Sequence, residues 1–142
     1  MNEYHPHETN IGFRAVVQRI VKSLKPHAAD YDAIIAIGHS GLVPGAAAAW
    51  ILNKPLVAIH KSGESPHCNY SGPPMDTRLA WVDDFIEGGV TFLNVRDYAN
   101  RFMCPIVLTV LYTDKRSVRR AGNIQFTRRS GTRIYEMEVE NP

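Results

Sequence analysis

The chain has 142 residues, 44% of them hydrophobic, and a formal net charge of +2. This length suits one domain around a single core, which we expect to span residues 1–142. No apolar run approaches a membrane span and the N-terminus is polar, so we expect a cytoplasmic protein without a membrane partner. The net charge is too small to argue on its own for nucleic-acid binding. Cys68 and Cys104 lack the spacing of metal ligands, so we expect both to be free thiols.

The N-terminal half predicts a helix, two strands and a second helix. Residues 13–24 carry apolar side chains at i, i+3 and i+4, the pattern of an amphipathic helix. Residues 31–37 and 55–60 are short apolar runs typical of core strands. Between these strands, residues 38–41 form a polar, glycine-containing loop that precedes an alanine-rich helix ending at Leu52. The free N–H groups of this loop can hold phosphate oxygens, although glycine-rich turns join strands to helices in many α/β proteins.

The stretch from residue 78 to residue 92 predicts a binding site. Residues 79–82 are apolar, as in a strand buried on both faces, and Asp83 and Asp84 stand where this strand ends. Gly88 and Gly89 then form a turn, and a helical pattern begins near Thr91. Two carboxylates beside an anion-binding helix start suit a ligand with sugar hydroxyls or a metal on one side and a phosphate on the other, as in a ribose phosphate. The alternative is an acidic strand end that only caps the next helix.

The C-terminal part predicts a fourth strand and a hairpin. Residues 105–112 are apolar, and residues 123–127 and 132–139 read as two strands around a turn. Repeated alternation of strands and helices implies a parallel sheet with right-handed crossovers. We therefore expect the α/β class, with a single-domain parallel sheet flanked by helices and a small C-terminal hairpin. Three aromatic side chains of this part could stack on a nucleobase, although packing is the simpler expectation: Tyr112, Phe126 and Tyr135.

Basic side chains are concentrated in a window without acidic residues near the C-terminus. A solvated face, a site for anionic substrate groups and a polyanion-binding surface are the three interpretations. The window contains Lys115, Arg116, Arg119, Arg120, Arg128, Arg129 and Arg133.

Two motifs resemble those of the type I phosphoribosyltransferases. Residues 82–91 follow that family's signature for phosphoribosyl pyrophosphate, in which a hydrophobic strand leads to two acidic residues and then to an acidic, Thr-Gly-x-Thr turn. The chain departs from this signature at Gly88, where the family usually has a hydroxyl residue. The run IIAIGHSGLVPG, residues 34–45, is similar to the pyrophosphate-binding loop of the xanthine and guanine type. His39 stands there where those enzymes often carry an arginine.

The resemblance implies a phosphoribosyltransferase core over about residues 31–112, with a hood in residues 113–142. It also implies transfer of a 5-phosphoribosyl group from phosphoribosyl pyrophosphate to a nucleobase, as in purine salvage, with Mg²⁺ as cofactor. Asp83 and Asp84 would hold the ribose hydroxyls and help to place Mg²⁺, and Glu87 would be a general base. The 5′-phosphate would be bound by Gly88, Gly89, Val90 and Thr91, and pyrophosphate by His39, Ser40, Gly41 and Lys61.

Several expectations depend on this resemblance. The polar residues 61–74 would form a lid that closes over the site, the alternative being an ordinary surface loop. We expect a homodimer. A second reading, favoured by His39, Gly88 and the basic window, is a non-catalytic, phosphoribosyltransferase-like nucleotide-binding regulator that acts on RNA or DNA. A third is a hydrolase of phosphorylated ribose.

Overall fold

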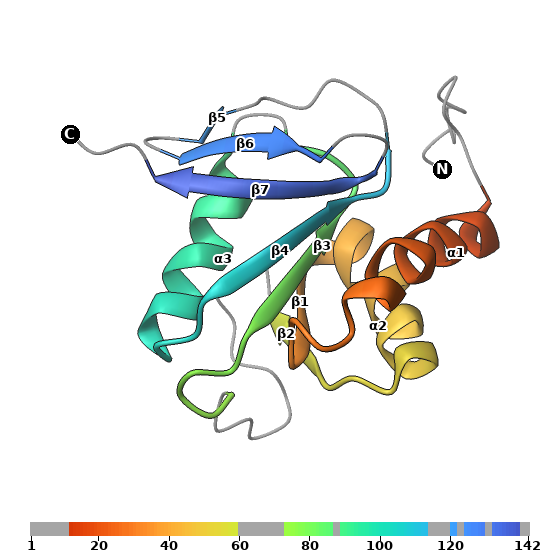
Figure 1. The fold of residues 1–142 in the computed structure, drawn as a ribbon, viewed down its shortest axis with the longest axis horizontal. Helices are drawn as coiled ribbons and strands as arrows, with labels where there is room; N and C mark the ends of the chain where they lie inside the picture. Colours follow the sequence, from red (N-terminus) through yellow and green to blue (C-terminus); the bar gives the residue numbers. More distant parts are fainter. Residues whose placement is uncertain are drawn as a thin grey trace, which may run out of the picture.

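The computed structural model describes residues 12–59, 73–86, 89–113, 120–121, 124–129 and 132–139, and Figure 1 shows the fold. Within these ranges the helices and strands follow one another in the order α1 (Phe13–Leu24), η1 (Lys25–His27), β1 (Ala33–Ile37), α2 (Gly38–Leu52), β2 (Leu56–Ile59), β3 (Leu79–Asp83), α3 (Val90–Arg101), β4 (Ile106–Leu111), β5 (Arg120–Ala121), β6 (Ile124–Arg128) and β7 (Ile134–Val139).

These strands form one sheet in the order β2-β1-β3-β4-β7-β6-β5. Strands β1 to β4 are parallel, which confirms the predicted α/β class and its four-stranded parallel core. The predicted C-terminal hairpin is present as β6 and β7, and β7 pairs with β4 in antiparallel orientation through Thr109 and Tyr135. This pairing, which makes the sheet mixed, was not predicted, and neither was the two-residue strand β5.

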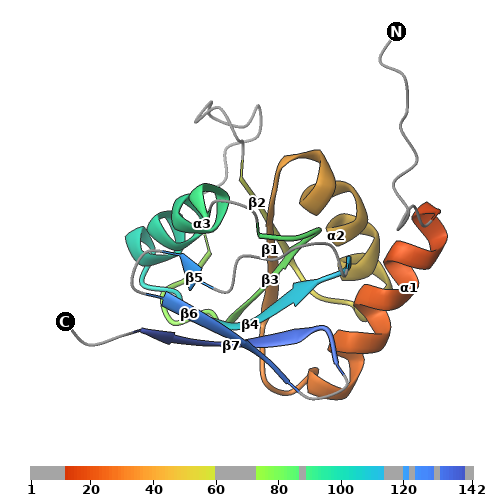
Figure 2. The same ribbon diagram turned by 90° about the horizontal axis from the view of Figure 1, so that it is seen from above.

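Helices cover both faces of the parallel part of the sheet, with α1 and α2 on one face and α3 on the other (Figure 2). Side chains that alternate along β1 and β3 separate into two apolar clusters. Ile34 and Val82 belong to the cluster that contains α1 and α2 residues, whereas Ile35 and Trp81 belong to the cluster that contains α3 residues. Because both faces are buried, all five residues of each of these strands are buried.

Helix α1 has the predicted bounds, but α2 begins earlier than expected. The prediction placed a loop over residues 38–41, whereas the helix starts at Gly38, directly after β1. Gly38 has a φ of 69°, which lets the chain turn from strand to helix within one residue. Gly45, further along the helix, would place an added Cβ 3.3 Å from the Cβ of Ala36. The glycines therefore let α2 lie close against the sheet.

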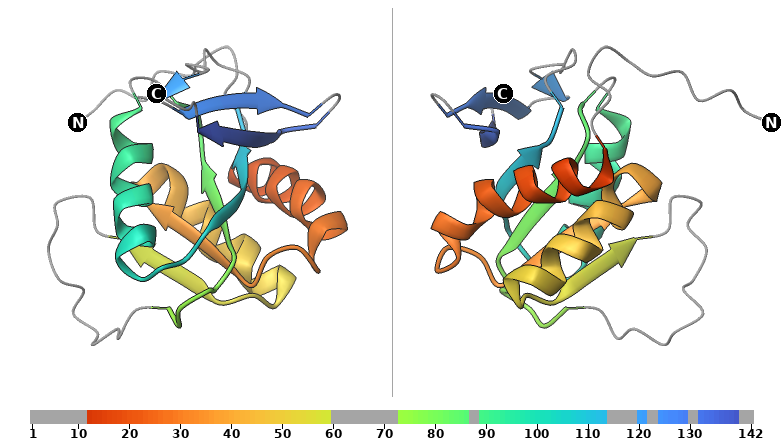
Figure 3. Two further views of the ribbon diagram at one scale, coloured as in Figure 1. Left: turned by 60° about the vertical axis from the view of Figure 1, so that its left-hand side comes forward. Right: turned by 90° about the vertical axis from the view of Figure 1, so that its right-hand side faces the viewer.

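The β6–β7 hairpin lies across the end of the sheet at which β3 and β4 finish (Figure 3). Phe126 of β6 is 2% exposed and its ring meets that of Phe92 edge-on, with 4.8 Å between centroids. Tyr112 is also buried, and Tyr135 packs against the α3-side cluster, so the expectation of packing roles is confirmed for these aromatic residues. Cys104 is a buried free thiol, and Cys68 lies outside the described residues.

Candidate functional site

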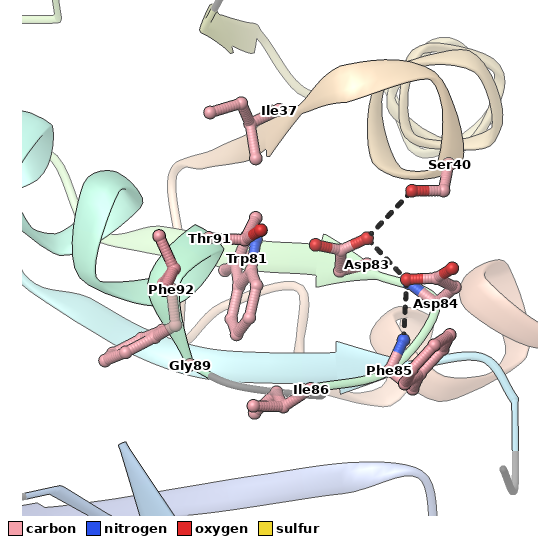
Figure 4. A pocket seen from close by; sticks show the side chains of 11 residues that line it. Ile37, Ser40, Trp81, Asp83, Asp84, Phe85, Ile86, Gly89, Thr91 and Phe92 are labelled. Carbon is pink, nitrogen blue, oxygen red and sulfur yellow. Dashed lines mark hydrogen bonds between the residues drawn. The ribbon is translucent and has the colours of Figure 1, made fainter. Parts of the chain in front are cut away.

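Strands β1 and β3 are adjacent and parallel, so the residues that follow them meet at one edge of the sheet. A cavity of about 270 Å³ opens at this edge (Figure 4). In open α/β sheets the carboxyl ends of the strands are where ligands bind. The cavity is lined by Ile37, Ser40, Trp81, Asp83, Asp84, Phe85, Ile86, Gly89, Val90, Thr91 and Phe92.

Asp83 is the last residue of β3 and is only 3% exposed. Its Oδ1 accepts a hydrogen bond from the main-chain N–H of Asp84 at 2.8 Å and another from the hydroxyl of Ser40 at 3.3 Å (Figure 4). Burial first, and then the side chain of Asp84 beside it, raise the pKa of the Asp83 carboxyl to about 8. A carboxyl group with a strongly raised pKa in a cavity marks a candidate functional site.

Asp84 is half-buried and turns its backbone away from the strand. Its Oδ1 accepts the N–H of Phe85 at 2.8 Å, while its main-chain carbonyl accepts both the N–H and the hydroxyl of Thr113 at 3.1 Å each. These bonds fix the chain beyond the end of β3 to the chain beyond the end of β4. The carboxylate of Asp84 is therefore held at the cavity by a fixed backbone.

The first turn of α3 forms the wall opposite Ser40 (Figure 4). Gly89 precedes the helix with a φ of 81°, a conformation that favours glycine. The helix start has no side-chain cap and no acidic residue in its first turn, so its N–H groups suit an anion. Phe92 anchors this turn, because its ring lies 5.1 Å from that of Trp81 on β3.

The first turn of α2 forms the other wall. This helix start also has no side-chain cap and no acidic residue in its first turn. Ser40 lines the cavity, and His39 beside it is exposed. An added Cβ at Gly41 would lie 2.9 Å from the carbonyl oxygen of Val82 and 3.6 Å from Oδ1 of Asp83, so only glycine lets this turn approach β3 so closely.

Most of the predicted site residues that the structure describes come together at this cavity. Ser40, Asp83, Asp84, Gly89, Val90 and Thr91 line it. His39 and Gly41 belong to the same turn as Ser40 but are not among its lining residues. Lys61, Glu87 and Gly88 lie outside the described residues, as do Lys115, Arg116 and Arg119 of the basic window. Of the lid predicted over residues 61–74, the structure describes only residues 73 and 74.

Sequence reasoning did not assign the apolar lining residues to the cavity, and Trp81 is the one for which a signal was available. Its indole is buried, and its Nε1 has no hydrogen-bond partner among the residues that the structure describes. Trp81 precedes Asp83 by two residues, and side chains two apart in a strand lie on the same face, so this spacing was the available signal. The other apolar lining residues, Ile37, Phe85, Ile86 and Phe92, could be assigned to the cavity only once the strands were placed.

The donor set at this cavity fits a Mg²⁺ ion. Among the described residues no group of three or more His, Cys, Asp or Glu side chains could hold a metal. Mg²⁺ does not need such a cage, since it is commonly bound by one or two carboxylates together with waters and substrate phosphates. Asp83 and Asp84 are two adjacent carboxylates at an open cavity, which is this kind of partial site.

Over the same described part of the chain, no helix has the length and apolar character needed to cross a membrane.

No protein-family model matches the sequence. An adenine phosphoribosyltransferase of Chlorobaculum tepidum is 34% identical over 56 residues, which are 39% of this chain and 32% of that protein. The chain thus spans about a third of the length of this curated relative.

Solved structures give a more extensive likeness. An adenine phosphoribosyltransferase from Thermoanaerobacter pseudethanolicus has a TM-score of 0.60 at 19% identity, over 70% of this chain and 66% of that one. A purine phosphoribosyltransferase from Pyrococcus horikoshii has a TM-score of 0.55 at 22% identity, over 74% and 77% of the two chains. A hypoxanthine-guanine phosphoribosyltransferase from Bacillus anthracis has a TM-score of 0.52 at 12% identity, over 81% and 79%. The protein therefore has the fold of the type I phosphoribosyltransferases, the family that its two sequence motifs resemble.

Proposed function

We propose that this protein transfers a 5-phosphoribosyl group from phosphoribosyl pyrophosphate to a ring nitrogen of a nucleobase and releases pyrophosphate. One observation carries the proposal: two carboxylates and two uncapped helix starts surround a single cavity at the carboxyl edge of the parallel sheet. This arrangement matches a ligand with hydroxyl groups at its centre and a phosphate at each end.

In this assignment the main-chain N–H groups of Gly89, Val90 and Thr91 bind the 5′-phosphate, because they lie at the uncapped start of α3. The turn around Ser40 at the start of α2 binds the pyrophosphate group. Asp83 and Asp84, which lie between these two turns, accept hydrogen bonds from the ribose hydroxyls. A sugar with a phosphate group at both ends would engage both turns.

Asp83 and Asp84 would also hold Mg²⁺, which when bound neutralises charge on the pyrophosphate group. In the reaction the C1′–N bond forms as the C1′–O bond to pyrophosphate breaks, and the bonding electrons leave with pyrophosphate. The base nitrogen gives its proton to a general base, the role expected for Glu87 from the sequence. Positive charge develops on the ribose ring. The carboxylates beside the ring stabilise this charge, and the two phosphate-binding turns align the sugar with the base.

A purine is the acceptor to test first, because the similar proteins include adenine, purine and hypoxanthine-guanine phosphoribosyltransferases. The test is pyrophosphate release from phosphoribosyl pyrophosphate with Mg²⁺ in the presence of adenine, guanine, hypoxanthine, xanthine, uracil, orotate or nicotinic acid. We expect release that depends on a purine. Binding of phosphoribosyl pyrophosphate without turnover would instead support the regulator, and release without any base would support the hydrolase.

A further inference from the structure

Pro44 interrupts the hydrogen bonding of α2 close to the candidate site. Proline has no main-chain N–H, so Pro44 cannot donate the usual helical hydrogen bond to the carbonyl of Ser40, four residues earlier. The structure supplies a partner from another element. The hydroxyl of Tyr112, which follows β4, donates to the Ser40 carbonyl at 2.7 Å, and Tyr112 is 8% exposed. A buried tyrosine hydroxyl thus completes the hydrogen bonding of the first turn of α2.

Tyr112 is itself held on several sides. Its main-chain N–H donates to the carbonyl of Asp83 at 3.1 Å, so Tyr112 also touches the end of β3. Its own carbonyl accepts hydrogen bonds from the guanidinium groups of Arg19, at 3.2 Å, and Arg133, at 3.4 Å. Tyr112 therefore connects the backbone of Asp83 to the backbone of Ser40. Hydrogen bonds from Arg19 of α1 and from Arg133, which precedes β7, hold Tyr112 in place.

We infer that Tyr112 is a positioning residue for the pyrophosphate-binding turn at the start of α2. This inference rests on the proposed function, since it takes pyrophosphate as the ligand of that turn. The hydroxyl of Tyr112 acts through Ser40: it fixes the Ser40 carbonyl, and with it the orientation of the main-chain N–H groups of the same turn. Within the described part of the chain, the hydrogen bonds of Tyr112 reach Ser40, Asp83, Arg19 and Arg133, and none of these residues belongs to α3, which forms the 5′-phosphate side of the cavity. Loss of the hydroxyl should therefore affect the two phosphate sites unequally.

The test compares Tyr112→Phe with Tyr31→Phe by calorimetric titration of magnesium pyrophosphate and, separately, of ribose 5-phosphate. Tyr31 is the matched control, because it is fully buried and, within the described part of the chain, its hydroxyl has no hydrogen-bond partner. We expect Tyr112→Phe to weaken pyrophosphate binding roughly fivefold to tenfold, the value of one hydrogen bond. Ribose 5-phosphate binding should change by less than about twofold, and Tyr31→Phe should change neither affinity by more than that.

Pro44→Ala provides a rescue. An alanine at this position has an N–H that can donate to the Ser40 carbonyl, as in an uninterrupted helix. In the Pro44→Ala background the hydroxyl of Tyr112 becomes redundant, so Tyr112→Phe should no longer weaken pyrophosphate binding. A loss caused by altered packing of the Tyr112 ring would not be rescued by a change in α2. This comparison also replaces the first one if Tyr112→Phe alone does not fold.

The outcomes separate the inference from the proposed function. Suppose that the parent protein binds both ligands. Tyr112 is then not a positioning residue if Tyr112→Phe leaves the pyrophosphate affinity unchanged, if it lowers the affinities for both ligands equally, or if Pro44→Ala does not restore the pyrophosphate affinity. In each of these cases the proposed function stands. If the parent protein binds neither magnesium pyrophosphate nor ribose 5-phosphate, the proposed function fails and this inference fails with it.

Discussion

The hydroxyl of Ser40 donates to Oδ1 of Asp83 at 3.3 Å, which joins the first turn of α2 to the last residue of β3. The main-chain N–H of Asp84 donates to the same oxygen, so Oδ1 of this buried carboxyl accepts two hydrogen bonds. Two neutral donors do not compensate for the loss of water around a charge, and the neighbouring carboxyl of Asp84 disfavours a second negative charge. The ionised form of Asp83 therefore lowers the stability of the ligand-free protein.

Asp83→Asn should stabilise the ligand-free protein at neutral and higher pH. Burial and the neighbouring Asp84 side chain raise the pKa of Asp83 from its ordinary value of 3.8 to about 8 in the folded protein. The stability that this group contributes is therefore fully present below about pH 3.8 and is lost as the pH rises to about 8. An asparagine keeps the accepting oxygen and carries no charge. We expect a gain of about 2 kcal/mol in the free energy of unfolding at pH 8, and a smaller gain at pH 5.

Urea unfolding of both proteins at pH 5 and pH 8 measures this difference, without added metal. Asp97→Asn is the control, since Asp97 is exposed on α3 and its replacement removes the same formal charge. The control should show the same pH dependence as the parent protein. An Asp83→Asn variant that is less stable than the parent protein at pH 8 would show that the carboxylate is well solvated or paired.

Gly41→Ala should destabilise the protein and weaken pyrophosphate binding. The new Cβ would lie 2.9 Å from the carbonyl oxygen of Val82, which is main chain and cannot move aside without moving β3. We expect a loss of about 1–3 kcal/mol in the free energy of unfolding, the usual cost of overpacking. Gly45→Ala is the control, because its Cβ would meet side-chain atoms alone, the Cβ of Ala36 at 3.3 Å and Cγ2 of Ile34 at 3.9 Å. The gain in helix propensity, about 1 kcal/mol, offsets these contacts.

Chemical unfolding and calorimetric titration of magnesium pyrophosphate measure both effects of the glycine variants. Equal stability and equal pyrophosphate affinity of Gly41→Ala and Gly45→Ala would contradict the close approach of α2 to β3.

Phe92→Ala should loosen the start of α3. Phe92 is 2% exposed and contacts the rings of Trp81 and Phe126, so it fixes the helix start both to β3 and to the β6–β7 hairpin. We expect a loss of about 3–5 kcal/mol in the free energy of unfolding. Ribose 5-phosphate binding should weaken as well, because the N–H groups of this turn would no longer be held toward the cavity.

Phe13→Ala is the matched control for Phe92→Ala, since Phe13 is 54% exposed at the start of α1 and its loss should change stability by less than about 0.5 kcal/mol. Thermal and urea unfolding measure the stability of the two variants. Titration of ribose 5-phosphate, at a temperature where both variants are folded, measures their affinity. Retention of full ribose 5-phosphate affinity by a folded Phe92→Ala protein would mean that the start of α3 is positioned by other contacts.

Local patterns predicted most of the elements of this fold. The bounds of α1 follow from its apolar periodicity, and the four parallel strands follow from short apolar runs between polar turns. The residues at the strand ends could be assigned to one edge, because parallel strands finish on the same side of a sheet. The meeting of Ser40, Asp83 and Thr91 at one cavity therefore follows from sequence order together with the parallel topology.

Features that depend on contacts between distant segments could not be predicted. The pairing of Tyr135 with Thr109 joins residues far apart in the chain, and neither strand carries a local signal that specifies its partner. The start of α2 at Gly38 depends on a single backbone angle. The bond from Tyr112 to Ser40 appears only when the end of β4 and the start of α2 are brought together in the folded protein. The predictions for Mg²⁺, for a homodimer and for the roles of Lys61, Glu87 and Gly88 remain predictions.

The most direct test of the proposed site is calorimetric titration of phosphoribosyl pyrophosphate with Mg²⁺ into the parent protein and into the double variant Asp83→Asn, Asp84→Asn. Asparagine keeps the size and much of the hydrogen bonding of aspartate, and it caps a helix about as well, so the double variant should remain folded by its melting curve. If these carboxylates hold the ribose and the metal, affinity should fall at least about tenfold. A folded double variant that binds phosphoribosyl pyrophosphate as tightly as the parent protein would contradict the assignment of Asp83 and Asp84 to the phosphoribosyl site.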